Sequence, residues 1–134
     1  MQIKPVSRKQ NIVVQELESE LLVYDLQTNK AFVLNETSAL IFQLCDGKRT
    51  VAEISDSMSR KLKTLVSEDF VWLALNELRK DGLLENSTEL NNYFAGFSRR
   101  EMVRKIGLAS MIALPLVSSV VAPNAVQAAS SCLD

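Results

Sequence analysis

Three helix-capping residues, Asn35, Thr50 and Ser67, divide the middle of this sequence into three helices. Each has a side-chain oxygen that can accept a hydrogen bond from the first turn of a helix, and apolar residues at helical spacing follow each of them. Thr50 is also followed by Glu53, in the spacing of a capping box. The caps therefore predict helices over residues 35–45, 50–62 and 67–81.

The residues before Asn35 have the composition of short strands. Residues 11–17 and 20–26 are rich in β-branched and aromatic side chains, as strands are. A polar turn follows, in which Asn29 suits a positive φ angle, and residues 31–34 then form a third apolar run. We therefore expect an α+β fold, in which a three-stranded antiparallel sheet is followed by three helices that cover one face of this small sheet.

The amino-acid composition argues against several classes of function. The sequence has no His, which removes the commonest general base and the commonest metal ligand. Its two cysteines, Cys45 and Cys132, are too few for a disulfide scaffold or a four-ligand zinc site. We expect Cys45 to be a small buried apolar residue, and the protein to be neither an enzyme nor a binder of a metal or cofactor.

The charge distribution argues against nucleic-acid binding and marks a boundary in the chain. The net charge is −1, and the expected third helix has more acidic than basic side chains, which repels phosphate. The sequence is acidic on balance before residue 97 and basic on balance after it. We therefore expect a domain over residues 1–88, a polar linker over 89–97 and a tail over 98–134, with the domain in the reducing cytoplasm.

The tail is similar to a twin-arginine translocation signal. Arg99 and Arg100 follow a serine and precede residues 106–133, which contain no charged side chain. Ala128 stands at the last position of a signal-peptidase cleavage pattern. We expect a C-terminal apolar helix, for which three roles remain open: a translocation or targeting element, a membrane helix with the basic residues on the cytoplasmic side, or a helix that packs on a partner or lies in the bilayer interface.

Three stretches of the domain, residues 22–26, 31–42 and 46–54, resemble the PqqD family, and the resemblance extends over roughly residues 11–86. The family is named for pyrroloquinoline quinone biosynthesis and includes domains that recognise precursor peptides of ribosomally made, modified natural products. The resemblance implies a winged-helix-like fold without catalytic residues. It also implies that the domain binds a leader peptide and presents it to a modifying enzyme, which in PqqD-like systems is often a radical-SAM enzyme.

The resemblance further implies where such a peptide would bind. In that family the leader is held as an added strand beside the third strand and against the third helix, because an exposed sheet edge offers unpaired main-chain groups. Carried over to this sequence, the edge would comprise Lys30, Ala31, Phe32, Val33 and Leu34, and the helix wall would comprise Trp72, Leu75, Asn76 and Arg79.

Alternatives remain open for the helix wall and for the whole protein. Trp72 could instead be a core side chain, and Arg79 could be a solvated residue at the C-terminal end of its helix. The alternative function is a membrane-targeted protein-interaction module that uses the tail as an anchor or translocation signal. Binding of DNA by a winged helix is disfavoured by the acidic third helix.

Overall fold

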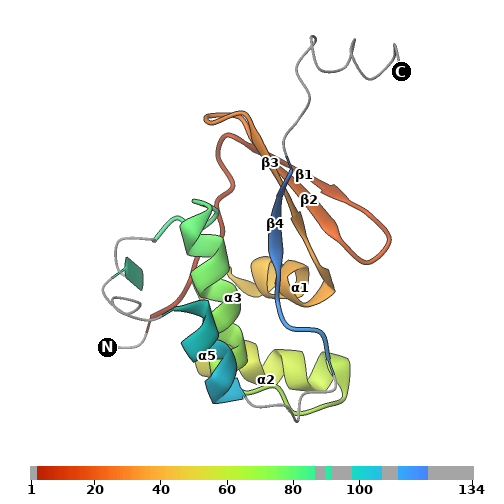
Figure 1. The fold of residues 1–134 in the computed structure, drawn as a ribbon, viewed down its shortest axis with the longest axis vertical. Coiled ribbons are helices and arrows are strands. Elements are labelled where there is room, and N and C mark those ends of the chain that lie inside the picture. Colours follow the sequence, from red (N-terminus) through yellow and green to blue (C-terminus); the bar gives the residue numbers. More distant parts are fainter. Residues whose placement is uncertain (1–2, 87–89, 92–97, 107–111, 121–134) are drawn as a thin grey trace.

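The computed structural model contains a four-stranded antiparallel sheet with helices beside it (Figure 1). It describes residues 3–86, 90–91, 98–106 and 112–120. The strands β1 (Ile12–Glu16), β2 (Leu21–Asp25) and β3 (Lys30–Leu34) form the expected meander. The strand β4 (Val117–Val120) comes from the tail and pairs with the free side of β3.

The three expected helices are confirmed, and each begins at the predicted cap. They are α1 (Glu36–Leu44), α2 (Val51–Leu62) and α3 (Glu68–Lys80). Asn35, Thr50 and Ser67 each accept a hydrogen bond from a backbone N–H of the first turn, and Thr50 forms the complete capping box. A further helix, α5 (Arg99–Ile106), lies in the tail and packs against α3.

The core lies between the sheet and the helices. The pairing of Leu21 with Leu34 and of Val23 with Phe32 places these four side chains on one face of the sheet, where all four are buried. The helices supply the other wall of the core. Its largest fully buried side chains from the three expected helices are Phe70, Ile41, Ile54, Met58, Leu73, Leu75 and Leu78.

The N-terminal segment joins the sheet to the helices, a role that the sequence did not reveal. Ser7 N donates to Cys45 O at 2.9 Å, and Arg8 N donates to Leu83 O at 2.9 Å. The Arg8 guanidinium forms an ion pair of 2.8 Å with Asp25, whose side chain is only 4% exposed. The segment therefore ties β2 to the loops that follow α1 and α3.

The described residues 112–120 of the tail differ from the expectation of a C-terminal apolar helix. Residues 113–116 have no regular secondary structure, and Val117–Val120 forms a strand instead of a helix. Pro115 has no N–H to donate within a helix, and the β-branched Val117 and Val120 suit a strand. Within the described residues, no helix is both long enough and apolar enough to cross a membrane.

Two other expectations are only partly covered by the described residues. The expected polar linker contains Leu90, which is 0% exposed and belongs to the core. Ala128 lies outside the described residues. The resemblance of the fold to a winged helix stays a prediction.

The Arg8–Asp25 ion pair predicts a pH-dependent part of the stability. Chiefly because Arg8 donates a hydrogen bond to the carboxylate, the pKa of Asp25 is lowered from 3.8 to about 2. A folded-state pKa below the unfolded value stabilises the protein above about pH 4, and this stabilisation is lost as the pH falls through about 2. We expect Asp25→Asn to lower the free energy of unfolding by about 1–2 kcal/mol at pH 6, allowing for partial solvent screening of Arg8.

Urea unfolding at pH 6 and near pH 2 measures this difference. The matched control is Asp56→Asn, because Asp56 is an exposed residue of α2. The deficit of Asp25→Asn relative to the control should shrink toward zero near pH 2. An equal deficit at both pH values would show that the ion pair does not provide the stabilisation.

Candidate functional site

The candidate site is the edge of β3 that faces away from β2. The sequence predicts that this edge, Lys30–Leu34, receives an extended peptide. In the structure it receives β4: Leu34 pairs with Val117, Val33 with Ser118, Phe32 with Ser119 and Ala31 with Val120. An extended segment of the chain therefore lies where an added strand was expected.

Asn35 extends this main-chain recognition beyond the end of β3. Its backbone N–H donates to Leu116 O at 3.1 Å. Its side-chain Oδ1 accepts from Leu116 N at 3.0 Å, and its Nδ2 donates to Leu114 O at 2.8 Å. Because Oδ1 also accepts from Ser38 N at 3.2 Å, one side chain both caps α1 and binds the backbone of the incoming segment.

Two hydroxyl groups in the first turn of α1 complete the contact. Thr37 Oγ1 donates to Ala113 O at 3.0 Å, and Ser38 Oγ lies 2.9 Å from Leu116 O. Both hydroxyl residues are buried, at 4% and 0% exposure. Together with Asn35 they form what we call the α1 clamp, defined as Asn35, Thr37 and Ser38. Since the clamp contacts backbone atoms, it holds an extended chain whatever its side chains are.

From the sequence alone, Asn35 is predicted only as a helix cap. The signal for the second role was the Asn35-x-Thr37-Ser38 cluster, which holds more polar groups than one cap requires. A polar side chain that is buried in the first turn of a helix needs a hydrogen-bond partner. In this protein the partners of Thr37 and Ser38 include carbonyl groups more than seventy residues away in sequence, with separations of 76 and 78 positions.

The expected helix wall on α3 is largely closed. Leu75 and Asn76 are both 0% exposed, and Trp72 is partly buried against the core cluster, in line with the alternative of a core role. Arg79 donates to Asn76 Oδ1 at 2.7 Å and to Asn91 Oδ1 at 2.9 Å, so it does not extend freely into solvent. Leu75 and Asn76 therefore offer no surface to a peptide, whereas Trp72 and Arg79 are partly exposed.

Helix α5 covers the neighbouring part of α3. Arg99 forms an ion pair with Glu77 of α3, and its Nη2 also donates to Pro115 O at 3.2 Å. Met102 adds an apolar contact and is 6% exposed. The other expected targeting residue, Arg100, is exposed. The two arginines thus differ, because only Arg99 is shown bridging α3 and the segment that leads into β4.

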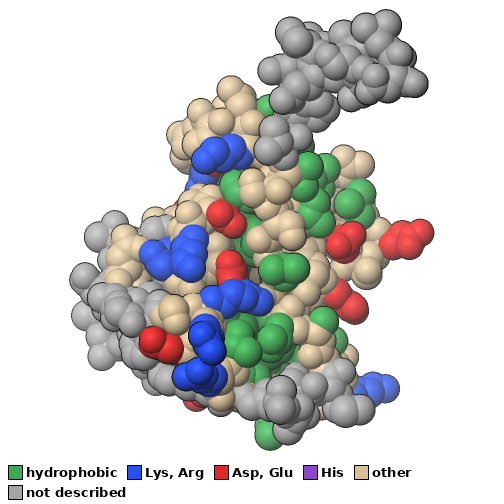
Figure 2. Space-filling model, in the orientation of Figure 1, with side chains coloured by type: hydrophobic (Ala, Val, Ile, Leu, Met, Phe, Trp, Pro, Cys, Tyr) green, Lys and Arg blue, Asp and Glu red, His purple; other side chains and the backbone are tan. Residues whose placement is uncertain are grey.

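The surface around the site has a charged part and an apolar part (Figure 2). Figure 2 shows Lys and Arg side chains, with some Asp and Glu side chains among them, over α3 and α5, whereas hydrophobic side chains lie over the sheet and along the approach to β4. The segment 112–120 itself carries no charged residue. A chain bound at the β3 edge therefore lies on apolar surface with a basic helix beside it.

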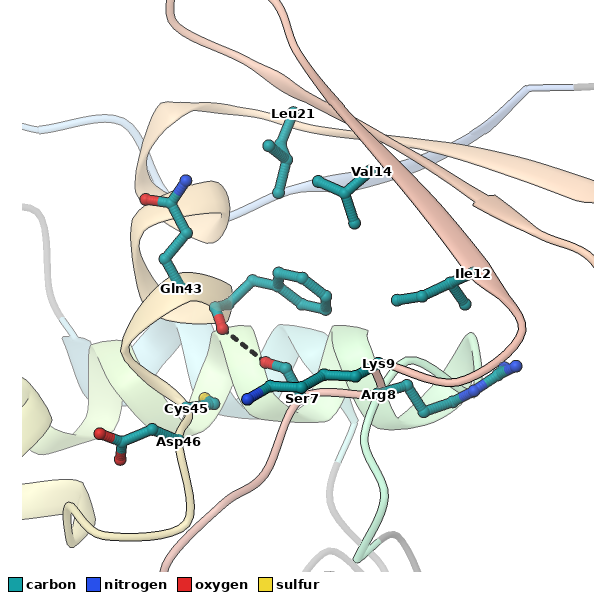
Figure 3. Close-up of a pocket in the computed structure, with 10 residues that line it drawn as sticks. Ser7, Arg8, Lys9, Ile12, Val14, Leu21, Gln43, Cys45 and Asp46 are labelled. Atoms are coloured by element: carbon teal, nitrogen blue, oxygen red, sulfur yellow. Dashed lines mark hydrogen bonds between the residues drawn. The ribbon is translucent and has the colours of Figure 1, made fainter.

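A separate pocket of about 370 Å³ lies between β1, α1 and the N-terminal segment (Figure 3). Ile12 and Val14 line it from β1, and Ser7 donates a hydrogen bond to the Phe42 carbonyl at its floor. Burial raises the pKa of the Cys45 thiol in its wall to about 12. Cys45 is therefore protonated and unreactive at neutral pH, and the expectation of a buried apolar residue is confirmed.

Metal ligation has no support in the part of the chain that the structure describes. No group of three or more Cys, Asp or Glu side chains there lies close enough to hold a metal ion. The chemistry that the described residues offer is main-chain hydrogen bonding at a sheet edge.

Residues 20–84 match a family model described as "Coenzyme PQQ synthesis protein D (PqqD)". The matched residues include β2, β3 and the three helices α1 to α3, and they leave out β1, α5 and β4. No curated protein and no solved structure matches the chain.

The α1 clamp predicts a selective effect of Asn35→Asp. Asp keeps an oxygen that caps α1, because Asp is as good a cap as Asn, but it lacks the Nδ2 donor to Leu114 O. We expect the loss of this hydrogen bond to cost about 1 kcal/mol, which corresponds to about five-fold faster amide exchange in Val117–Val120.

Hydrogen exchange followed by mass spectrometry reads this out in the full chain. Exchange within α1 should stay unchanged, because its cap is preserved. The control is Asn29→Asp, at a turn residue between β2 and β3 with φ +58°. Equal exchange of β4 in the Asn35→Asp variant and the control would mean that the clamp does not hold the segment.

Proposed function

Since residues 20–84 form a PqqD-like domain, we propose that this chain is a non-catalytic adaptor that binds a peptide as an added strand on β3 and presents it to a modifying enzyme. The observation that carries the proposal is the pairing of β3 with an extended segment through four opposed residue pairs. The α1 clamp continues the same backbone recognition. PqqD-family domains are accessory proteins without catalytic activity, which supports an adaptor role.

The geometry of the edge defines the kind of peptide that fits. A strand beside β3 places alternate side chains on the core face of the sheet, where Val117, opposite Leu34, is 8% exposed. Pro115, two residues earlier, is also buried, whereas Leu116 between them is 47% exposed. The site therefore suits an extended peptide with two apolar residues separated by one freely variable position.

The finer part of the proposal concerns the partners. The peptide is the leader of a ribosomally made precursor, and the modifying enzyme is of the radical-SAM class. The support for both is the resemblance of residues 20–84 to the PqqD family. In this proposal the chain binds the leader through its backbone and leaves the remainder of the precursor available to the enzyme.

The alternative function, a targeting module that works through its tail, has weaker support. It would require Arg99 to leave Glu77 and the carbonyl of Pro115, and β4 to leave β3. Since these contacts hold the tail on the domain, we do not adopt targeting as the proposed function.

Selection of peptides by the immobilised full chain tests the adaptor role. We expect a displayed random library to yield binders with two apolar residues at spacing i and i+2. In a synthetic binder, N-methylation should weaken binding about ten-fold or more at alternate positions, because only every second N–H of an added strand faces β3. The intervening positions should tolerate the methyl group.

Substitutions in the chain provide the matched control for this selection. Thr37→Val removes a clamp hydroxyl that donates to the segment beside β3. In a chain whose β4 is released from the edge by Ser118→Pro with Ser119→Pro, this change should weaken peptide binding several-fold. Thr64→Val makes the same change after α2, away from the edge, and should have no effect. Binders that tolerate N-methylation at every position, or that respond equally to both variants, would place peptide binding elsewhere.

A further inference from the structure

We propose that the chain carries its own ligand for the β3 edge: the segment Ile112–Val120 occupies the peptide site in cis, and an outside peptide binds only by displacing it. This inference rests on the proposed function, because it names the resident occupant of the same site and a regulation that follows. The β3 edge is therefore closed in the isolated protein and opens by exchange of one strand for another.

The segment has the contacts of a bound ligand along its length. Its C-terminal part pairs with β3 from Leu34 to Ala31. Its middle part is held by the α1 clamp, which contacts the carbonyl groups of residues 113, 114 and 116. Pro115 and Val117 are buried and Leu116 between them is exposed, so burial alternates over these three residues, whereas Ser118, Ser119 and Val120 are all exposed. Burial of alternate positions together with backbone pairing is the usual pattern of strand addition.

The contacts are also suited to exchange. Most hydrogen bonds to the segment go to its backbone, so another extended chain can replace them one for one. The segment has no charged residue and forms no ion pair of its own. Arg99 of α5 donates a hydrogen bond to Pro115 O. The Arg99 side chain is 34% exposed, so this link adds modest stability.

Attachment in the same chain sets the threshold for displacement. A segment joined by a short connection has an effective concentration on the order of millimolar. If the free segment bound with a dissociation constant of about 100 μM, the edge would be roughly nine-tenths occupied and the apparent affinity for an outside peptide would fall about ten-fold. Weak or accidental peptides would then be excluded, whereas a tightly binding peptide would still enter.

Fluorescence anisotropy with a labelled synthetic peptide of residues 112–120 tests the proposal in the full chain. Val117→Asp places a carboxylate at a buried position of the segment and leaves β3 and the clamp unchanged. Leu116→Asp adds the same charge one residue earlier, at an exposed position. We expect Val117→Asp to bind the labelled peptide about ten-fold or more tightly than the wild type, and Leu116→Asp to behave like the wild type.

A second releasing variant guards against a failure of Val117→Asp to fold. The double change Ser118→Pro and Ser119→Pro removes N–H donors from β4 without adding charge. Amide exchange of β3 in each variant, without peptide, shows whether the segment has been released. Faster exchange of β3 with an unchanged α2 is the expected sign of release from a folded domain.

The outcomes separate this inference from the proposed function. Equal affinity in the wild type and both releasing variants would overturn resident occupancy, and the adaptor role would survive. Release of β4 without any binding of the labelled peptide would overturn the claim that residues 112–120 are a ligand. The adaptor role itself would fail if no peptide from the library bound to the released edge either.

Discussion

A β-meander that ends in β3 leaves alternate N–H and C=O groups of that strand without partners on the side away from β2. These backbone groups need hydrogen-bond partners, either water or another strand. Burying the edge of β3 without such partners would therefore be unfavourable. In this chain the groups are paired with β4. The pairing of this edge with β4 accounts for three other features. These are the position of the tail, the second role of the α1 cap and the packing of α5 on α3.

The link between fold and site is local. Strand β3 passes directly into α1 through Asn35, so the residue that ends the edge also begins the helix. Its backbone and side chain together contact Leu114 and Leu116, and Thr37 and Ser38 extend the contact along the first turn. Helix capping and peptide binding use the same polar groups, so a stable α1 and a well-formed clamp are expected together.

Much of the domain was predictable from the sequence, because its signals are local. Caps such as Thr50 with Glu53, and the turn at Asn29 with its positive φ, act within a few residues and were confirmed. The pairing of β4 with β3 was not predictable in this way. Residues 106–133 are uniformly uncharged, so their pattern fits a helix or a strand, and the outcome was decided by a sheet edge more than eighty residues earlier. The Arg8–Asp25 ion pair was missed for the same reason, since its partners are far apart in sequence.

The segment 112–120 and an outside peptide cannot occupy the β3 edge at the same time. A reducible disulfide between β3 and β4 tests this most directly. Val33 and Ser118 are opposed in the sheet, so Val33→Cys with Ser118→Cys, in a chain that also carries Cys132→Ser, would join β3 to β4 by a disulfide. Peptide binding should be abolished in the oxidised chain and should return when the disulfide is reduced. Equal peptide affinity in the oxidised and reduced forms would contradict the account, because the edge would then bind peptide while β4 remained in place.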